Sequence, residues 1–255
     1  MSIMEKFKLD GKTALVTGCS KGIGFGIAKG LAEAGADIIG VSSTLDVGSE
    51  IEKYVESIGR RFYCFSCDFS QRQNTHNFLQ ELGENNLEPN ILVSNAGSLI
   101  RTELNEHNDA HWDRILEINL SSQFVLAREL SPKMIERGWG KIIFTASILS
   151  HQGGLFVPSY TASKGGIAQL TKALSNELAD KGINVNSIAP GYVVTDITTA
   201  LRQDKNRSAD LMARIPMKRW GTIDDMAGAA VYLASDASDY VNGELLNVDG
   251  GWMGR

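Results

Sequence analysis

The sequence predicts an α/β fold, in which seven strands form a doubly wound, mostly parallel sheet with helices on both faces. Three observations support this prediction. Six short apolar runs alternate with helical patterns, a seventh apolar run lies near the C-terminus, and a glycine-rich turn joins the first run to the first helix. Such alternation places successive strands side by side through helical crossovers, as in a Rossmann-type sheet.

Composition favours a single domain covering residues 1–255. The chain has 255 residues, of which 43% are apolar and 22% are charged, and this is enough to bury one sizeable core. It contains no linker, internal repeat or low-complexity tract. The net charge of −5 and the absence of a Lys/Arg cluster argue against nucleic acid or an anionic membrane surface as a partner. No apolar run reaches the roughly 18 residues that a membrane span needs.

The three cysteines indicate a reducing compartment. Their odd number, together with the lack of an N-terminal apolar segment, favours a cytoplasmic location. Cys64 and Cys67 match C-x-x-C, but they lie in an expected strand and point to opposite faces, so packing is their expected role. His107 and His111 lie four apart without a third ligand at matching spacing. We therefore expect no metal site.

The strands follow from apolar, β-branched runs that end at glycine, proline or polar residues. A polar arm at 1–11, expected to be loose, closes with the turn signal Asp10-Gly11. The expected strands are then 12–17, 36–41, 62–67, 90–94, 141–146, 182–188 and a last one within 241–252.

The helices follow from an apolar periodicity of about 3.6 residues. They are expected from the glycine turn through residue 34, around 47–59, and at 70–83, 108–137, 157–179 and 224–234. The longest has an apolar stripe formed by Trp112, Ile115, Leu116, Leu120, Phe124, Val125 and Leu126. Asn119 lies within it, where an Asn is usually a tolerated polar position or the site of a kink.

The turn after the first strand has the glycine pattern G-x-x-x-G-x-G. Glycines let the backbone approach a pyrophosphate, and the following helix directs its amides and dipole at the anion. The pattern differs from the dinucleotide fingerprint G-x-G-x-x-G, and alone it could equally be a turn that needs glycine only for tight packing. The candidate cofactor contacts in this turn are Gly18, Ser20, Lys21, Gly22, Ile23 and Gly24.

The second strand ends at Ser42, Ser43 and Thr44, where the adenosine ribose of a dinucleotide would lie. A carboxylate here would favour NAD and an arginine would favour NADP, but neither is present. Lys21 could assist a phosphate, whereas Asp46 comes slightly late for the ribose. The residues leave the choice between NAD and NADP open, with Ser42 and Ser43 as candidate contacts.

Residues 140–166 hold the candidate catalytic groups. Tyr160 and Lys164 lie four apart on an expected helix, which places them on one face. An ammonium beside a phenol favours the phenolate, so we expect Lys164 to lower the pKa of Tyr160 from its usual value of about 10. Ser147 ends the preceding strand, at the edge where parallel sheets bind ligands. Alone, Tyr-x-x-x-Lys can arise by chance on an amphipathic helix.

Taken together, these motifs resemble the short-chain dehydrogenase/reductase family over about residues 9–252. The pattern Thr-Gly-x-x-x-Gly-x-Gly and a Ser before Tyr-x-x-x-Lys have the family's spacing. Residues 94–97 resemble its Asn-Asn-Ala-Gly motif, with Ser94 in place of the first Asn, and 190–195 match Pro-Gly-x-x-x-Thr. The resemblance implies further cofactor contacts at Asp68, Phe69, Asn95, Ala96, Gly97, Tyr160, Lys164, Pro190, Gly191, Val193 and Thr195.

The resemblance also implies a reaction. Tyr160 would exchange a proton with a secondary alcohol or ketone while a nicotinamide cofactor exchanges the hydride. Ser147 would bind the substrate oxygen, and Lys164 would hold the nicotinamide ribose. Asn119 would bend the long helix and complete a water-mediated proton relay from Lys164. Family members commonly form homotetramers, so a homotetramer is expected here.

Several segments are similar to a subgroup of the family that acts on deoxy sugar acids from uronate polymers. They are 98–101, 149–154, 157–164, 214–221, 238–243 and 248–252. The similarity implies an anionic substrate of the 2-deoxy-gluconate or 2-keto-3-deoxy-gluconate type, and it favours NAD. It indicates neither which acid is used nor the direction of the reaction.

Basic side chains could recognise the carboxylate of such a substrate. The candidate substrate contacts are Ser147, Gln152, Tyr160, Arg101, Arg202 and Arg207, with Arg214 as a further candidate. Residues 196–222 are charged and interrupted by Pro216, so they form either a solvated surface segment or a lid over the substrate. Each arginine could equally form a surface ion pair.

Two alternatives remain. A 3-oxoacyl-carrier-protein reductase of the same family would prefer NADPH and carry a basic docking patch, which the overall charge does not favour. A non-catalytic dinucleotide sensor would have lost Tyr160 or Lys164, and both are present.

Overall fold

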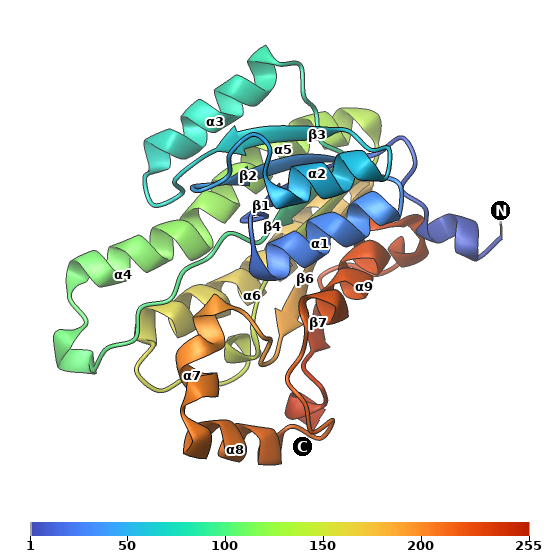
Figure 1. Ribbon diagram of the computed structural model, residues 1–255. Helices are drawn as coiled ribbons and strands as arrows, with labels where there is room; N and C mark the ends of the chain where they lie inside the picture. The colour runs from blue at the N-terminus through green and yellow to red at the C-terminus, as the bar shows by residue number, and fades with distance from the viewer. Residues whose placement is uncertain (1, 255) are drawn as a thin grey trace.

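The computed structural model describes residues 2–254, which contain a seven-stranded sheet with all neighbouring strands parallel (Figure 1). The strands are β1 (Thr13–Thr17), β2 (Asp37–Ser42), β3 (Phe62–Ser66), β4 (Ile91–Ser94), β5 (Gly140–Thr145), β6 (Ile183–Pro190) and β7 (Leu245–Val248). Their order is β3-β2-β1-β4-β5-β6-β7. The predicted doubly wound α/β fold is confirmed, with a wholly rather than mostly parallel sheet. Residues 1 and 255, the ends of the expected single domain, lie outside the described residues.

Helices cover both faces of the sheet. They are α1 (Gly22–Glu33), α2 (Glu50–Ser57), α3 (Arg72–Glu84), α4 (Asp109–Leu116), α5 (Ser122–Arg137), α6 (Pro158–Leu178), α7 (Thr199–Gln203), α8 (Lys205–Arg214) and α9 (Ile223–Ala234). In β1, Ala14 and Val16 share a core cluster with residues of α1, α2 and α9. Leu15 instead belongs to a cluster with residues of α3, α5 and α6. Both faces of the central strands β1, β4 and β5 are buried, which is why they form nearly continuous apolar runs in the sequence.

The strand order brings the predicted site residues to one edge. β1 lies between β2 and β4, and the chain leaves β1 toward α1 but leaves β4 toward the opposite face. A crevice forms beyond the carboxyl ends of parallel strands at such a switch point. The glycine loop, residues 95–97 and Ser147 come after β1, β4 and β5, and Pro190-Gly191 lies at the end of β6, so all of them arrive at this crevice.

The N-terminal arm is packed more closely than its polar composition predicts. Met4–Phe7 forms a 3-10 helix. Leu9 is only 1% exposed, and its amide donates to the Ala34 carbonyl at 2.8 Å. The arm is therefore not loose throughout, because one buried leucine anchors it beside α1.

The helix predicted at 108–137 is continuous but changes its winding around Asn119. α4 passes into a π-helical segment, Glu117–Ser121, which leads directly into α5. A π turn holds more residues than an α turn, so it shifts the faces on which later side chains lie. Trp112 and Phe124 are 40% and 39% exposed, so the predicted apolar stripe is wrong at these two positions.

Residues 196–222 leave the sheet after β6 and form α7 and α8, drawn in orange in Figure 1. The base of the segment is closed by backbone bonds, from Val194 to the Gly221 carbonyl at 2.9 Å and from Gly221 to the Tyr192 carbonyl at 2.8 Å. α7 and α8 contain no buried residue. The segment is thus anchored at its base and lightly packed beyond it.

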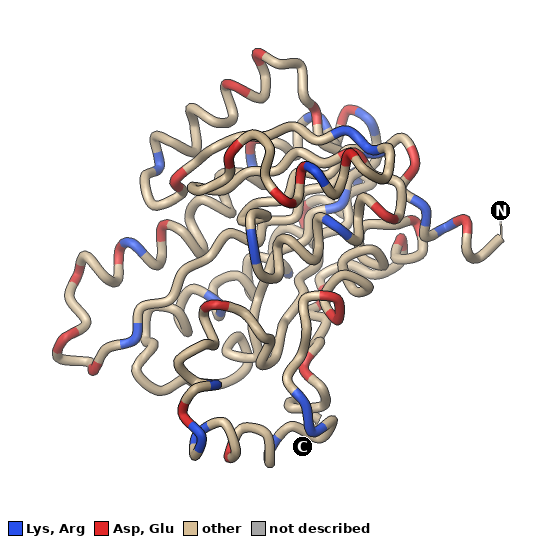
Figure 2. The backbone as a smooth tube through the Cα atoms, in the orientation of Figure 1, with Lys and Arg blue, Asp and Glu red and all other residues tan. Residues whose placement is uncertain are grey.

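The described helices are all too short or too polar to cross a bilayer. Figure 2 shows acidic and basic positions mixed along α1, α2, α3 and α4.

Gly182 starts the pairing of β6 with β5. Its φ is +80°, and a Cβ there would lie 2.2 Å from the Gly138 carbonyl oxygen. We expect Gly182→Ala to lower the free energy of unfolding by more than about 3 kcal/mol, because a backbone clash adds to the left-handed conformation. Urea unfolding at fixed protein concentration measures the change.

Gly59 is the matched control for this substitution. Its φ is +78°, but no atom lies within 4 Å of the position of a Cβ. Gly59→Ala should therefore cost only about 1 to 2 kcal/mol. Equal losses for the two variants would show that the contact with Gly138 is unimportant.

Candidate active site

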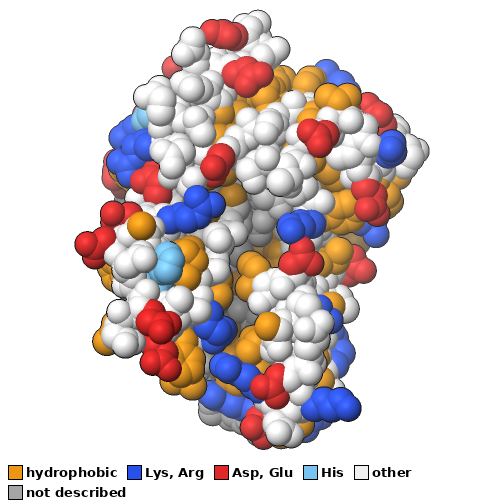
Figure 3. Space-filling view, turned by 60° about the vertical axis from the view of Figure 1, so that its left-hand side comes forward, with side chains coloured by type: hydrophobic (Ala, Val, Ile, Leu, Met, Phe, Trp, Pro, Cys, Tyr) orange, Lys and Arg blue, Asp and Glu red, His pale blue; other side chains and the backbone are white. Residues whose placement is uncertain are grey.

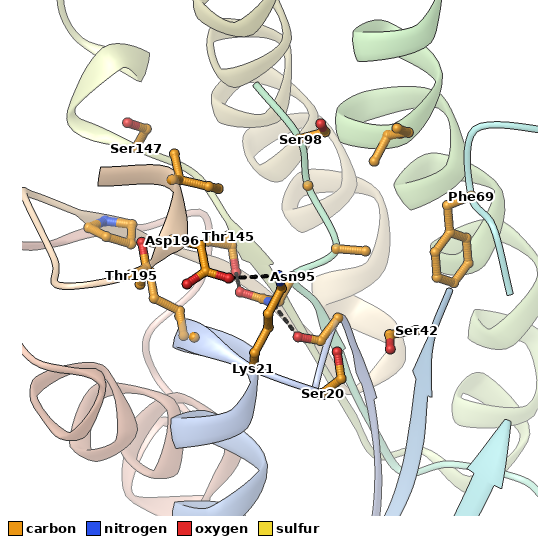
Figure 4. Close-up of a pocket in the computed structure, with 18 of the residues that line it drawn as sticks. Ser20, Lys21, Ser42, Phe69, Asn95, Ser98, Thr145, Ser147, Thr195 and Asp196 are labelled. Carbon is orange, nitrogen blue, oxygen red and sulfur yellow. Dashed lines mark hydrogen bonds and ion pairs between the residues drawn. The ribbon is translucent and has the colours of Figure 1, made fainter. Parts of the chain in front are cut away.

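A pocket of about 440 Å³ lies beyond the carboxyl ends of the central strands (Figure 4). This volume is within the range of small-molecule sites. Nearly all residues predicted to bind a cofactor line it: Gly18, Ser20, Lys21, Gly22, Ile23, Ser42, Ser43, Asp68, Phe69, Asn95, Ala96, Gly97, Tyr160, Lys164, Pro190, Gly191, Val193 and Thr195. Gly24 does not line the pocket, and Ser147 does.

Asn95 joins the glycine loop to the end of β4. Its side-chain amide donates to the carbonyls of Thr17 at 3.0 Å and Gly18 at 3.4 Å. Gly18 and Gly22 have φ values of +68° and +59°, which glycine adopts without strain. A Cβ on Gly24 would lie 2.2 Å from the Gly18 carbonyl oxygen, so Gly24 serves the packing of the loop on α1 rather than direct contact with a ligand.

Hydroxyl groups line the pocket at the end of β2. Ser42 Oγ is buried and has no hydrogen-bond partner among the described residues, although buried hydroxyls are normally paired. The hydroxyls of Ser20 and Thr44 lie 3.4 Å apart and connect the glycine loop with β2. An unpaired hydroxyl beside a cradle of glycines fits a dinucleotide whose ribose reaches β2.

Lys21 and Asp196 form an ion pair of 2.7 Å between the glycine loop and the start of segment 196–222 (Figure 4). Both side chains are more than 70% exposed, so the pair contributes little stability. Lys21 could assist a phosphate according to the sequence, but its ammonium already has a carboxylate partner.

Asp68 accepts the Ser70 amide at 2.9 Å, and this bond holds the pKa of Asp68 below its ordinary value.

Ser147 is held at the end of β5 by the turn that follows. Its Oγ accepts the Leu149 amide at 3.1 Å. Ser150 Oγ accepts the Ser147 amide at 3.3 Å and donates to the Lys164 carbonyl at 2.7 Å. Ser150 therefore ties the end of β5 to α6, and this fixes Ser147 relative to Tyr160.

Lys164 is a buried amine next to Tyr160. Its Nζ donates to the Thr145 carbonyl at 2.6 Å and lies 5.6 Å from the centre of the Tyr160 ring. Burial lowers the pKa of Lys164 to about 8. Tyr160 is half-buried, and burial raises its pKa while the hydrogen bond with Ser147 acts in the opposite direction. The expected lowering of the Tyr160 pKa by Lys164 is not seen in this structure, because desolvation dominates and Lys164 is not among the groups that shift the phenol.

Asn119 is fully buried in the π-helical segment. Its side chain exchanges hydrogen bonds of 2.8 and 2.9 Å with the backbone of Ser98 and donates to Ser163 Oγ at 3.1 Å. A Cβ on Gly97 would lie 3.5 Å from Asn119 Oδ1 and 4.0 Å from Lys164 Nζ. Asn119 thus approaches Lys164 from behind Gly97 without lining the pocket, and both of its side-chain donors are already used.

The other predicted substrate contacts lie outside this pocket. Arg101 donates to the Leu155 carbonyl at 2.9 Å, and its pKa is lowered by burial and by the charge of Arg207. Arg202 donates to Thr199 Oγ1 at 3.2 Å. In the part of the chain that is described, no carboxylate lies within 4.0 Å of Arg101, Arg202 or Arg207, so the alternative of surface ion pairs does not apply to them. Figure 3 shows basic side chains gathered along the lower part of the groove.

Several pocket residues were not predicted from the sequence. They are Thr44, Cys67, Ser98, Arg114, Ile118, Thr145, Ala146, Asp196, Ile197 and Thr198. Thr145 and Ala146 immediately precede Ser147, so the strand ending there could have indicated them. Arg114 lies on α4 and helps to lower the pKa of Asp68, but no local pattern marks it, because only the fold brings α4 to the pocket.

Cys64, Cys67 and His107 have structural partners in the fold. Cys64 of β3 packs against one core cluster, and Cys67, directly after β3, belongs to the other, so the two thiols lie on opposite faces as expected. The ring nitrogens of His107 are each 2.9 Å from a hydroxyl, of Thr102 and Ser159. Residues 2–254 contain no cluster of three or more side chains that could hold a metal ion.

Comparison with known proteins agrees with this geometry. Residues 18–253 match the family model described as enoyl-(acyl carrier protein) reductase. The chain is 57% identical to the 2-dehydro-3-deoxy-D-gluconate 5-dehydrogenase of Pseudoalteromonas atlantica, over 99% of this chain and 100% of the relative.

Two solved structures are similar over nearly the whole chain. One, described as an NAD(P)-dependent gluconate 5-dehydrogenase from Beutenbergia cavernae with bound NADP, has a TM-score of 0.94 and 42% identity, covering 98% of this chain and 100% of that one. The other is a gluconate 5-dehydrogenase from Burkholderia cenocepacia in complex with NADP and tartrate. It has a TM-score of 0.93 and 35% identity and covers 100% of both chains.

Lys164→Met tests the cost of the buried amine. Folding lowers the pKa of Lys164 from 10.5 to about 8, so above pH 8 the unfolded chain keeps a proton that the folded protein has released. Stability due to this group therefore rises with pH through that window. We expect Lys164→Met to be more stable than the wild type at pH 7, and the difference to shrink as the pH rises above 8. Thermal unfolding of both proteins from pH 7 to 9.5 measures this difference in stability. A difference that does not change with pH would contradict the lowered pKa of Lys164.

Proposed function

The chain belongs to the short-chain dehydrogenase/reductase family, and we propose that it interconverts a secondary hydroxyl and a ketone on a deoxy sugar acid. Membership makes it an oxidoreductase that uses a nicotinamide cofactor. The substrate would be of the 2-deoxy-gluconate or 2-keto-3-deoxy-gluconate type. The observation that carries this class is the full-length identity to a 2-dehydro-3-deoxy-D-gluconate 5-dehydrogenase.

Tyr160 is the residue placed to move the proton at the substrate oxygen. The nicotinamide, when bound, carries the hydride. Ser147 donates a hydrogen bond to the substrate oxygen and offsets the charge that develops there. Lys164 binds the nicotinamide ribose, and a pKa of about 8 lets its amine gain or lose a proton near neutral pH. Because the side-chain donors of Asn119 are occupied, its backbone is the part available to hold a water of the relay.

We propose that both NAD and NADP are used. The subgroup resemblance favours NAD, whereas the relatives from B. cavernae and B. cenocepacia bind NADP. The pocket wall formed by Ser42, Ser43 and Thr44 supplies hydroxyls rather than a carboxylate, so it does not repel a 2′-phosphate. Lys21 attracts a phosphate less strongly while it is paired with Asp196.

The substrate carboxylate would bind at Arg101 and Arg207, under residues 196–222 acting as a lid. The two guanidiniums are close enough for Arg207 to lower the pKa of Arg101, which means that they repel one another. An anionic ligand would relieve this repulsion. Arg202 is less suitable, because it is already bonded to Thr199 within α7.

We also propose that the protein forms a homotetramer and that it is located in the cytoplasm. Leu120, Phe124 and Leu170 line a hollow between α5 and α6, and Phe124 is 39% exposed. Apolar surface on the long helices suits contact with further copies of the chain. The free cysteines suit a reducing compartment.

A carrier-protein reductase is the rival supported by a specific observation. The family model that matches residues 18–253 is described as an enoyl-(acyl carrier protein) reductase. Arg101 and Arg207, which have no acid partner among the described residues, could serve an acidic carrier, but two guanidiniums close enough to affect one another suit a small anion better. A non-catalytic sensor would not need Lys164 and Tyr160 side by side.

Initial rates with a panel of substrates test the proposed function. The panel contains 2-dehydro-3-deoxy-D-gluconate, 2-deoxy-D-gluconate, gluconate and a 3-oxoacyl thioester, each with both cofactors. We expect turnover of at least one deoxy sugar acid and a preference between NAD and NADP of less than about ten-fold, because no charged group at β2 discriminates between them. Turnover of the thioester alone would overturn the substrate class.

Tyr160→Phe removes the proton donor and acceptor while keeping the ring. We expect kcat to fall by more than a hundred-fold, in the range of general acid–base catalysis, with cofactor affinity changed by less than about three-fold. Steady-state rates and fluorescence titration with NADPH measure the two effects. Tyr240→Phe, at a fully exposed tyrosine, is the control and should leave both unchanged. Retention of more than about a tenth of kcat would remove Tyr160 from this role.

A further inference from the structure

The side-chain oxygen of Gln152 is held by two donors. Trp252 Nε1 lies 3.3 Å and Arg214 Nη2 lies 3.4 Å from Gln152 Oε1. An indole N–H and a guanidinium can only donate, so the atom of the amide that faces them must be the oxygen. The Gln152 amide nitrogen is therefore turned away from both groups. Among the described residues it has no hydrogen-bond partner, so its two protons are available to a ligand.

Trp252 is firmly packed and so can hold this orientation. It is 2% exposed and shares a small core cluster with Ile148 and Ile215. Its ring meets that of Tyr192 edge-on at 4.9 Å, and the Arg214 guanidinium lies 3.9 Å from its centre. These neighbours come from the segment after β5, the segment after β6 and residues 196–222, so Trp252 connects three parts of the chain that are distant in sequence.

The surroundings of Gln152 supply donors and positive charge. Burial raises the pKa of the Tyr192 phenol, and the guanidiniums of Arg214, Arg207 and Arg101 are close enough to act in the opposite direction. Arg101 also bonds to the loop that follows Gln152, through the Leu155 carbonyl. A ligand end that fits here must carry acceptors and negative charge, as the carboxylate and adjacent hydroxyls of a sugar acid do.

We propose that Trp252 is a positioning residue for substrate specificity: together with Arg214 it orients the Gln152 amide so that its nitrogen donates to an oxygen of the sugar acid. This inference rests on the proposed function. It goes beyond that function by giving the C-terminal turn a part in recognition, through a residue that does not itself touch the reacting atoms. It also means that movement of α8, which carries Arg214, changes the orientation of Gln152.

Trp252→Phe tests the proposal, because phenylalanine keeps a ring beneath Arg214 and beside Tyr192 but lacks the N–H donor. With 2-dehydro-3-deoxy-D-gluconate as the substrate, we expect KM to rise about three- to ten-fold, in keeping with one lost hydrogen bond. We expect kcat to stay within about two-fold and the KM of the cofactor to be unchanged. Trp220→Phe is the matched control. Trp220 also meets the Tyr192 ring, at 5.6 Å, but has no bond to Gln152, so its substitution should leave KM unchanged.

Two variants of Gln152 separate positioning from a general loss of packing. Gln152→Ala should raise KM as Trp252→Phe does, and the double variant should be no worse than Gln152→Ala alone, since Trp252 acts through Gln152. Gln152→Glu keeps an acceptor toward Trp252 and Arg214 but cannot donate, so its KM should rise more than that of Gln152→Ala. Full additivity in the double variant, or wild-type KM in Gln152→Glu, would overturn the proposal.

Failure of this inference can be distinguished from failure of the proposed function. A wild-type enzyme that turns over no sugar acid would overturn the proposed function and, with it, this inference. A wild-type enzyme that turns over the acid, combined with an unchanged KM in Trp252→Phe, would overturn only the role of Trp252. Trp252 would have a purely structural role if Trp252→Phe raised the KM of the cofactor or greatly lowered the melting temperature, and if its effect on the KM of the sugar acid added fully to that of Gln152→Ala.

Discussion

The position of β1 between β2 and β4 is the constraint on which the site depends. Because the chain leaves β1 and β4 toward opposite faces, the edge of the sheet opens between the glycine loop and residues 95–97. Asn95 then spans this opening through its bonds to Thr17 and Gly18. β5 and β6 continue the sheet on the same side, so the residues that follow them reach the same edge. Strand order brings the catalytic groups together, and side-chain hydrogen bonds only adjust their positions.

The sequence predicted this sheet well because each buried strand is a continuous apolar run, and such runs are local signals. The glycine loop and Tyr160 with Lys164 were also predictable, since their spacing alone carries the information. Contacts between distant segments were not. Lys21 and Asp196 are 175 residues apart, and Gln152 and Trp252 are 100 apart. Periodicity likewise could not indicate the π-helical turn at Glu117–Ser121, because the turn depends on packing against the rest of the fold.

The pKa of Tyr160 could not be predicted from its spacing to Lys164. Four residues on a helix place an amine next to a phenol, but they do not show how much water surrounds either group. In the folded protein both groups lose hydration, and this favours the neutral form of each. The same burial therefore raises the pKa of Tyr160 and lowers that of Lys164, so it separates two pKa values that lie close together in free solution. Desolvation, rather than attraction between an ammonium and a phenolate, sets the state of this pair.

Chemistry and specificity are built from different parts of the chain. Ser147, Tyr160 and Lys164 stand on a strand end and a long helix, and a buried carbonyl and Ser150 hold them in place. The proposed substrate end consists of segments that meet only in the folded protein, namely the turn after Ser147, residues 196–222 and the C-terminal turn. Rigid elements can keep one reaction constant while the connecting segments vary, which is how one fold serves many substrates. Because Arg214 lies on α8 and Trp252 in the C-terminal turn, the proposed role of Gln152 would let a change in either residue alter recognition without disturbing Ser147, Tyr160 or Lys164.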